Sequence, residues 1–213
     1  VNADYLETQL AKTGLIDLEE IGIDATQEDL DEFMALPSSQ SLLQKSIAAD
    51  HPIDIAIKEG FIVDASKDTH SYEGSFMAAF IRHLLIRHNR SFSFETVMSH
   101  SSKIDEITSV VSLGYKAYLY FICIDSPDVN VSRVDNRVDK GGHPVPEDKI
   151  VDRYYRTLGH LHTVLPHCYR AYLFDNSGTK SVLIAELYKG AMQIKTDTLP
   201  NWFIDYVLPH YTV

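Results

Sequence analysis

Residues 116–124 read KAYLYFICI, and this stretch decides the expected fold. Every residue from Ala117 to Ile124 is hydrophobic, so both faces of the segment are apolar, as in a strand buried inside a parallel sheet. A second short hydrophobic run, at Ala171–Phe174, has the same character. Helical patterns lie between and before these runs. This alternation predicts an α/β domain with a largely parallel sheet flanked by helices.

The remaining elements follow from hydrophobic periodicity and from capping residues. Helical spacing predicts helices over Ala3–Lys12, Tyr72–His88, Ser101–Leu113, Glu147–Leu165 and Leu199–Leu208. The sequence SFSFE predicts a short strand at Ser91–Glu95, and Val182–Tyr188 with Met192–Lys195 predicts a hairpin around Gly190. Residues 15–70 do not fit the alternation, and we expect a helical insertion there, with Thr26 capping one helix.

Composition restricts the classes of protein that need to be considered. The 213 residues, 45% of them hydrophobic and 23% charged, suffice for one domain with a sizeable core. The formal net charge of -11 argues against general binding of nucleic acid, which favours basic surfaces. A local cluster of arginines could still bind an anionic ligand.

The cysteines and the hydropathy pattern favour a cytoplasmic protein. Cys123 and Cys168 do not have C-x-x-C spacing, which is consistent with reduced thiols. No apolar stretch reaches the length of a membrane span, and no signal peptide is visible. His160 and His162 do not share a helix face, so we expect no metal site formed by protein side chains.

A basic segment at residues 133–155, RVDNRVDKGGHPVPEDKIVDRYY, predicts two helices joined by a hinge. Arg133 and Arg137 are four residues apart and therefore share a helix face, and Lys140 extends this cationic row. The Gly-Gly pair that follows permits a sharp turn. Such a helix–turn–helix, spanning 128–165, is typical of a lid whose arginines close over a transferring phosphoryl group. The ordinary alternative is a solvated basic helix face.

Polar residues follow the predicted strands, where ligands bind in open α/β sheets. They are Glu95, Thr96, Ser99, His100, Asp125, Asp175, Asn176 and Ser177. Each has an ordinary alternative: a strand-to-helix cap for Glu95 and Thr96, and a turn for the DNSG segment that begins at Asp175. Asp4 is equally suited to capping a helix.

Five short motifs, taken in order, resemble the zeta-toxin-like P-loop kinases. They are VNAD at Val1–Asp4, SFSFET at Ser91–Thr96, YLYF at Tyr118–Phe121, RVDNRVDKGGHPVPEDKI at Arg133–Ile150, and YLFDNSG at Tyr172–Gly178. The G-G-H-x-V-P-E-D run is the most specific of them. The resemblance covers roughly residues 1–14 and 71–190. It implies a single domain over 1–213 with a P-loop NTPase-like sheet.

The resemblance also implies roles for individual residues. Asp4 matches the family's general base on a sugar hydroxyl, and Arg133, Arg137 and Arg153 match the region of the lid arginines, which together form the expected catalytic set. The expected substrate-binding residues are Glu95, Thr96, Ser99 and His100. The expected nucleotide-binding residues are Lys140, Arg156, Asp175 and Asn176. Together these assignments require Asp4 and the lid arginines to meet at one pocket.

The chain departs from the family pattern in one respect. The 213 residues contain no phosphate loop of the form G-x-x-x-x-G-K-[ST]. We therefore expect the loop and the first strand within about 25 to 40 residues upstream of Val1, the size of part of a βαβ unit. ATP and Mg²⁺ are expected only together with that loop, because its amides and lysine hold the phosphates. The 213 residues alone are expected to be inactive and not to bind ATP with useful affinity.

Several functions are compatible with these features. The first is a small-molecule kinase that transfers the ATP γ-phosphoryl group to a hydroxyl of a nucleotide sugar, such as UDP-N-acetylglucosamine, with an antitoxin protein as a possible partner. The second is a non-catalytic binding or regulatory module of the same fold. The third is an ATPase with another acceptor.

Overall fold

The computed structural model describes residues 1–66, 69–139 and 145–211, apart from the side chain of Arg137. It has a mixed α/β architecture and divides into two compact units, Val1–Thr96 and Val97–Val213, here named unit 1 and unit 2. One domain over 1–213 was expected. That expectation stays a prediction, and the buried hydrophobic side chains of the described residues gather in two clusters, one in each unit.

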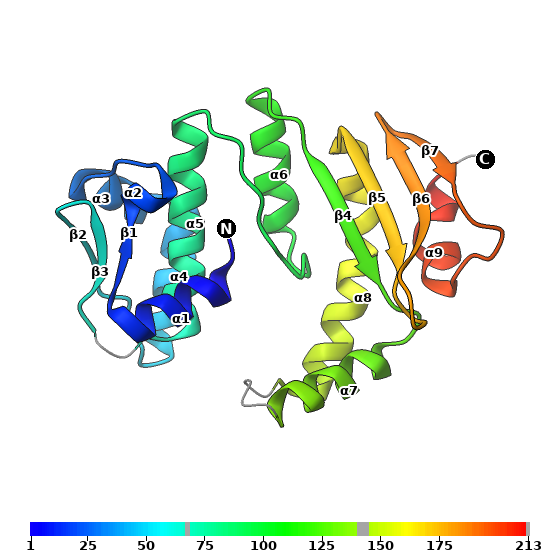
Figure 1. The fold of residues 1–213 in the computed structure, drawn as a ribbon, viewed down its shortest axis with the longest axis horizontal. Coiled ribbons are helices and arrows are strands. Elements are labelled where there is room, and N and C mark those ends of the chain that lie inside the picture. The colour runs from blue at the N-terminus through cyan, green and yellow to red at the C-terminus, as the bar shows by residue number, and fades with distance from the viewer. Residues whose placement is uncertain (67–68, 140–144, 212–213) are drawn as a thin grey trace. The chain divides into compact units, whose positions relative to one another are not determined.

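Unit 1 combines helices with a small antiparallel sheet (Figure 1). Its sheet has the strand order β1-β3-β2, and both strand pairs are antiparallel. The elements are α1 (Ala3–Thr13), β1 (Leu15–Asp17), α2 (Leu18–Ile21), α3 (Gln27–Ala35), α4 (Pro37–Ala48), β2 (Ile55–Lys58), β3 (Phe61–Asp64) and α5 (Ser71–Arg87). The segment 15–70, where a helical insertion was expected, contains α2, α3 and α4 together with the three strands of this sheet.

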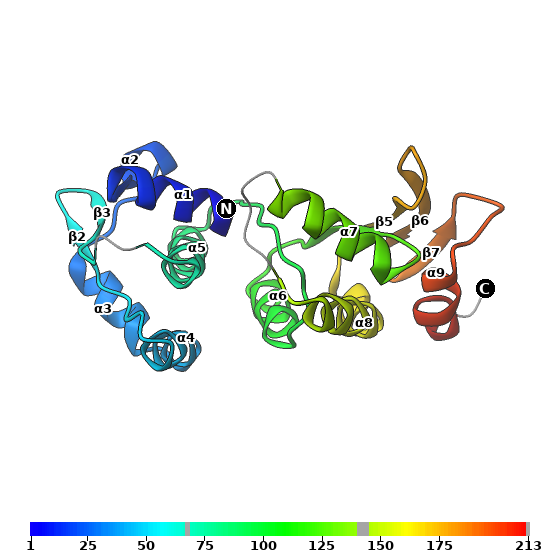
Figure 2. The same ribbon diagram turned by 90° about the horizontal axis from the view of Figure 1, so that it is seen from below.

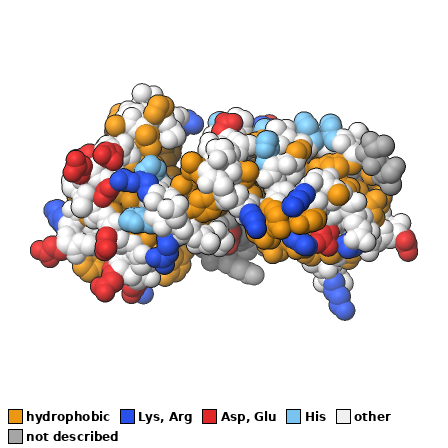
Figure 3. Space-filling view, turned by 90° about the horizontal axis from the view of Figure 1, so that it is seen from above, with side chains coloured by type: hydrophobic (Ala, Val, Ile, Leu, Met, Phe, Trp, Pro, Cys, Tyr) orange, Lys and Arg blue, Asp and Glu red, His pale blue; other side chains and the backbone are white. Residues whose placement is uncertain are grey.

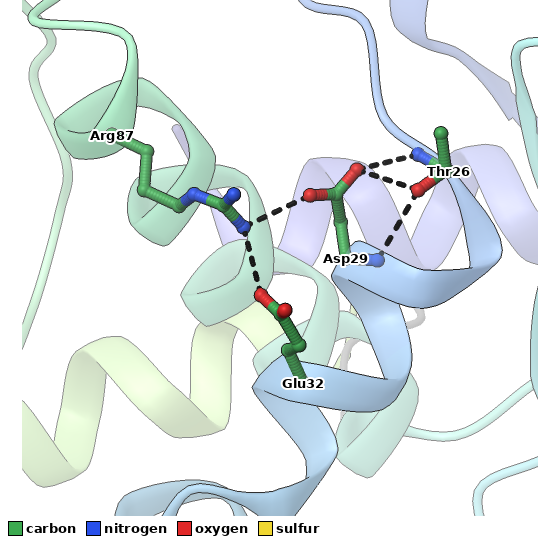
Figure 4. Close-up of polar contacts among 4 residues, drawn as sticks. All are labelled: Thr26, Asp29, Glu32 and Arg87. Atoms are coloured by element: carbon green, nitrogen blue, oxygen red, sulfur yellow. Dashed lines mark hydrogen bonds and ion pairs between the residues drawn. The ribbon is translucent and has the colours of Figure 1, made fainter.

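The start of α3 shows how local sequence fixes an element of unit 1 (Figure 4). As expected, Thr26 caps this helix: its Oγ1 accepts from the Asp29 backbone N–H at 3.3 Å, and its own backbone N–H donates to Asp29 Oδ2 at 2.8 Å. The bond from the Thr26 backbone is the main reason that the pKa of Asp29 is lowered. Arg87 of α5 donates to Asp29 Oδ1 at 2.9 Å and lies 3.4 Å from Glu32 Oε2. The Asp29 carboxylate, which closes the capping box with Thr26, therefore also ties α3 to α5, and this contribution is lost when acid protonates Asp29.

Helix α5 forms the centre of unit 1. Phe33 of α3 packs against Phe76 and Phe80 of α5, with ring centroids 5.3 Å apart in both pairs. On another side α5 lies close to α1, and Gly74 permits this approach. A Cβ atom on Gly74 would lie 2.7 Å from the Ala3 carbonyl oxygen and 2.8 Å from the Glu7 Cβ atom. The absence of a side chain at Gly74 thus fixes the distance between α1 and α5.

Unit 2 contains a four-stranded sheet with helices packed against one face (Figure 2). Helices α6, α8 and α9 share one hydrophobic cluster with β4, β5 and β6, which includes Ile104, Leu158, Leu173 and Trp202. The elements are α6 (Ser102–Ser112), β4 (Tyr118–Cys123), α7 (Pro127–Val138), α8 (Glu147–Val164), a short 3-10 helix (Leu165–His167), β5 (Arg170–Asp175), β6 (Val182–Tyr188), β7 (Ala191–Ile194), α9 (Asn201–Tyr206) and a second 3-10 helix (Leu208–His210).

The sheet of unit 2 is mixed rather than largely parallel. Its strand order is β4-β5-β6-β7, and β4 pairs with β5 in parallel, whereas β5–β6 and β6–β7 are antiparallel. The connection from Asp175 to Val182 is too short for the crossover that a parallel pair requires. The expected burial of β4 on both faces is also wrong, because Tyr120 and Ile122 are 65% and 64% exposed.

Two further sequence expectations concern connecting segments. The predicted strand at Ser91–Glu95 is wrong, because this segment belongs to no sheet. Within unit 1 it lies beside the start of the chain, where the Val1 ammonium group donates to the Ser93 carbonyl oxygen.

Helices α7 and α8 lie where the two lid helices were predicted. The hinge residues 140–144 between them lie outside the described residues.

Replacing Gly74 tests the close approach of α1 to α5. We predict that Gly74→Ala destabilises unit 1 by about 1 to 3 kcal/mol, because the added methyl group overpacks the contact. The control is Gly159→Ala in α8, where a Cβ atom meets nothing within 4 Å and should stabilise the helix by about 0.5 to 1 kcal/mol. Amide hydrogen exchange of α1 and urea unfolding followed by circular dichroism measure both effects. Unchanged protection of α1 in Gly74→Ala would contradict the packing described here.

Candidate functional site

The parallel pairing of β4 and β5 brings two aspartates to the same edge of the sheet in unit 2. Cys123 is paired with Asp175 at the end of the register, and Asp125 follows two residues after Cys123. The backbone N–H of Asn176 donates to the Cys123 carbonyl oxygen at 2.7 Å. The polar residues expected after these two strands are therefore neighbours.

Asp175 holds its own turn and anchors α9. Its Oδ1 atom accepts from Ser177 Oγ at 2.8 Å and from the indole Nε1 of Trp202 at 3.0 Å. Its Oδ2 atom accepts from the Ser177 backbone N–H at 3.2 Å. Both carboxylate oxygens thus bond within the protein, which favours the turn interpretation of this segment over a nucleotide contact.

Asp125 completes the same network from the end of β4. Its backbone N–H donates to Ser177 Oγ at 2.8 Å. Its carboxylate accepts from Asn201 Nδ2 at 3.0 Å and from the Trp202 backbone N–H at 3.3 Å, at the start of α9. Sequence reasoning missed Asn201 and Trp202 as partners, because no local signal connects them with a residue more than 70 positions earlier.

Arg133 connects α7 to this edge of the sheet. Its Nη2 atom donates to the Asn176 carbonyl oxygen at 3.1 Å. Two motifs of the resemblance, RVDNRVDKGG and YLFDNSG, therefore meet in unit 2. The guanidinium group of Arg133 is exposed and lies beside the Asp125–Asp175 network.

The other cationic residues of the predicted lid differ in their surroundings. Arg153 is exposed on α8. Arg156 forms an ion pair with Asp152, one turn earlier on the same helix, at 2.7 Å, which matches the ordinary reading of a solvated helix face. Lys140 and the side chain of Arg137 lie outside the described residues. The meeting of Asp4 with the lid arginines involves both units and stays a prediction.

A second cluster of predicted site residues lies in unit 1. Asn2 Nδ2 donates to Glu95 Oε2 at 3.0 Å, and Asn2 Oδ1 accepts from the Tyr5 backbone N–H at 2.9 Å. Asn2 therefore caps α1 and joins the VNAD and SFSFET motifs. Asp4, in the first turn of α1, and Glu95 and Thr96 are exposed. Asp4 is not the capping residue, so the helix-cap interpretation applies to Asn2 instead.

A buried arginine that the sequence analysis did not select lies beside this cluster. Arg82 of α5 is only 6% exposed, and its guanidinium carbon lies 4.9 Å from the centroid of the Phe94 ring. Burial, followed by the charge of Arg82, lowers the pKa of the Val1 amino group, while the charge of Glu95 opposes this shift. The sequence feature that could have identified Arg82 is the position of an arginine among the hydrophobic residues of α5, because a buried cation needs a specific partner or role.

Ser99 and His100 belong to unit 2, where they precede α6. His100 Nδ1 accepts from the Ser102 backbone N–H at 3.2 Å, so His100 helps to begin the helix. Met98, just before them, is buried and has a φ of 55°, a left-handed conformation that is costly for a residue other than glycine. Thr157 Oγ1 donates to the Val97 carbonyl oxygen at 2.8 Å and helps to fix this conformation.

Neither cysteine is suited to be a nucleophile. Burial raises the pKa of Cys123 to about 12 and that of Cys168 to about 11, so both remain thiols at neutral pH.

Within residues 1–66, 69–139 and 145–211, no three His, Cys, Asp or Glu side chains gather as a metal site would require. No helix in this same part of the chain has the length and hydropathy needed to cross a bilayer.

Removing the Asp175 carboxylate tests whether it is a structural group. We predict that Asp175→Ala destabilises unit 2 by about 1 to 3 kcal/mol, because Trp202 Nε1 and Ser177 lose their acceptor. Trp202 is the single tryptophan of the chain, so its fluorescence emission should also shift to longer wavelength. Asp205→Ala, an exposed position on α9, should change the stability by less than about 0.5 kcal/mol. Equal stability of the two variants would contradict a structural role for Asp175.

Comparison with known proteins gives one partial relative. The chain is 31% identical over 72 residues to a Haemophilus influenzae protein described as uncharacterized. The match covers 34% of this chain and 51% of that protein, so the chain spans about half the length of the relative. No protein-family model matches the chain, and no solved structure matches it. The resemblance to the zeta-toxin-like kinases therefore stays a prediction.

Proposed function

We propose that this chain binds the hydroxyl-bearing acceptor of a phosphotransferase and supplies the base that activates the hydroxyl. The observation that supports this proposal most is the bond between Asn2 Nδ2 and Glu95 Oε2. It joins two motifs that are 93 positions apart in the sequence, both of which the resemblance assigns to the acceptor side. The exposed carboxylates of Asp4 and Glu95 are available to a ligand at the surface of unit 1.

The chemistry follows from the residue types. The Asp4 carboxylate accepts the proton of the attacking hydroxyl as the phosphoryl group transfers, which requires a separation within hydrogen-bond reach. The side chains of Glu95 and Thr96 accept and donate hydrogen bonds to the other hydroxyl groups of a sugar. The resemblance assigns to Arg133, Arg137 and Arg153 the stabilisation of negative charge on the transferring group. The acceptor class proposed from the resemblance is a nucleotide sugar.

The residues present do not fit the triphosphate of ATP or its Mg²⁺. Phosphate binding in this class of enzyme needs a glycine-rich loop with its lysine, and the 213 residues contain none. Among the predicted nucleotide-binding residues, Asp175 bonds to Ser177 and Trp202, and Arg156 pairs with Asp152.

Titration with UDP-N-acetylglucosamine tests the acceptor site. We expect saturation-transfer NMR to detect binding by the 213-residue chain, and we expect Glu95→Gln to weaken it about tenfold, the effect of one charge-assisted hydrogen bond. Glu28→Gln, at an exposed position on α3, is the matched control in the same unit and should change nothing. Absence of binding, or an equal effect of the two variants, would argue against the acceptor site.

Calorimetry of the 213-residue chain with ATP and Mg²⁺ should show no micromolar affinity.

The role of Asp4 is tested by turnover rather than by binding. In a form of the protein that carries a phosphate loop, Asp4→Ala should abolish phosphorylation of the acceptor while acceptor binding and folding are retained, because a base acts in the transition state. Unchanged turnover would exclude Asp4 as the base.

A non-catalytic binding or regulatory module is the second candidate. The internal bonds of Asp175 and the ion pair of Arg156 favour it, because these side chains stabilise unit 2 without a nucleotide. Such a module would bind a nucleotide sugar or a protein partner but would show no Asp4-dependent turnover.

A further inference from the structure

A pocket in unit 2 lies at the amino ends of β4 and β5, the opposite edge of the sheet from Asp125 and Asp175. It is open to solvent on one side, and its volume is about 310 Å³, at the lower end of the range of small-ligand sites. The side chains that line it include Tyr115, Lys116, Pro166, His167, Tyr169 and Lys189. Because β4 and β5 are each six residues long, this amino-end pocket is about 20 Å along the strands from the carboxyl edge.

Two ammonium groups converge on one aromatic ring in the amino-end pocket. Lys116 Nζ lies 4.8 Å from the centroid of the Tyr169 ring, and Lys189 Nζ lies 5.9 Å from the same centroid. Neither lysine forms an ion pair with a carboxylate of the described residues, in contrast to Lys103 and Lys195, which pair with Glu106 and Glu186. The pocket is therefore locally positive in a chain whose formal net charge is -11.

Tyr188 lies beside Tyr169 and Lys189. The hydroxyl groups of Tyr169 and Tyr188 are 3.4 Å apart, and Lys189 Nζ lies 5.3 Å from the Tyr188 ring centroid. The hydrogen bond with Tyr169, followed by the charge of Lys189, lowers the pKa of Tyr188. Figure 3 views the end of unit 2 where β4 and β5 begin, and there Lys and Arg side chains surround a hydrophobic surface.

Lys189 stands in the tight turn between β6 and β7. Lys189 and Gly190 form the two-residue connection between β6 and β7, and their φ values are 49° and 83°. A turn with two positive φ values favours Asn-Gly, because asparagine tolerates this conformation better than other side chains. A lysine here is an unfavourable choice for the turn. Glu59 and Gly60, in the turn between β2 and β3, have the same backbone conformation, with φ values of 51° and 82°, so this turn geometry is not particular to Lys189.

We propose that the amino-end pocket binds a small aromatic anion, a phosphate monoester or carboxylate carried on a planar ring. Lys116 and Lys189 neutralise the anionic group, since lysine acts as a compact charge toward phosphate and carboxylate. The Tyr169 ring and the apolar walls at Pro166 and Val111 contact the ring of the ligand. This site is separate from the proposed acceptor site and does not depend on it.

The ligand class is tested by NMR titration of the 213-residue chain with phenyl phosphate and benzoate. We expect saturable shifts of the amide signals of Tyr169 and Lys189, and we expect the affinity to fall as salt is raised, because screening weakens exposed charge pairs. Phenol, which has the ring without the charge, and inorganic phosphate, which has the charge without the ring, should each bind at least about tenfold more weakly. Equal affinity for either control probe would overturn the proposal.

Substitutions of the two lysines test the site itself. Lys189→Asn removes the ammonium group and places a residue suited to the turn, so the variant should fold at least as well as the parent chain. We expect this variant and Lys116→Gln each to weaken phenyl phosphate binding about tenfold, and the double variant to abolish it. Lys180→Gln, an exposed lysine at the other end of the sheet, should leave binding unchanged. Undiminished binding in Lys189→Asn, or no binding by the parent chain, would overturn the proposal.

Discussion

The parallel pairing of β4 with β5 is the constraint on which the candidate sites of unit 2 depend. Six residues of each strand stay in register, from Tyr118 with Arg170 to Cys123 with Asp175. Because the strands run in the same direction, both amino ends lie at one edge of the sheet and both carboxyl ends at the other. The first edge carries Lys116 and Tyr169, and the second carries the two aspartates. A shift of register would separate the members of both groups.

The two edges differ in how their polar groups are used. At the carboxyl edge Asp125 and Asp175 bond to Ser177 and to α9, so their charges stabilise the fold. At the amino edge the ammonium groups lie against the Tyr169 ring, and they form no ion pair with a carboxylate in the part of the chain that the structure describes. The second arrangement leaves charge available to a ligand. In unit 1 the same distinction separates Asn2, which caps α1, from Asp4, whose carboxylate is exposed.

Much of the local structure could be predicted from the sequence, whereas the contacts that form the sites could not. Helices α5 and α8 and the hairpin around Gly190 follow from periodicity and turn residues, and they are confirmed. The burial of β4 on both faces was overestimated because hydrophobicity on both faces does not distinguish a central strand from an edge strand with exposed hydrophobic residues. The bonds from Trp202 to both aspartates, and the burial of Arg82 beside Phe94, join distant positions that no local pattern connects.

Cross-strand nuclear Overhauser effects between β4 and β5 test the central constraint most directly. The parallel register predicts contacts between the backbone protons of Leu119 and Ala171, and between those of Phe121 and Leu173, because these residues are register partners. Contacts between Tyr118 and Asp175 instead would show an antiparallel pair. That result would contradict the account, because it would place the two aspartates at opposite edges of the sheet.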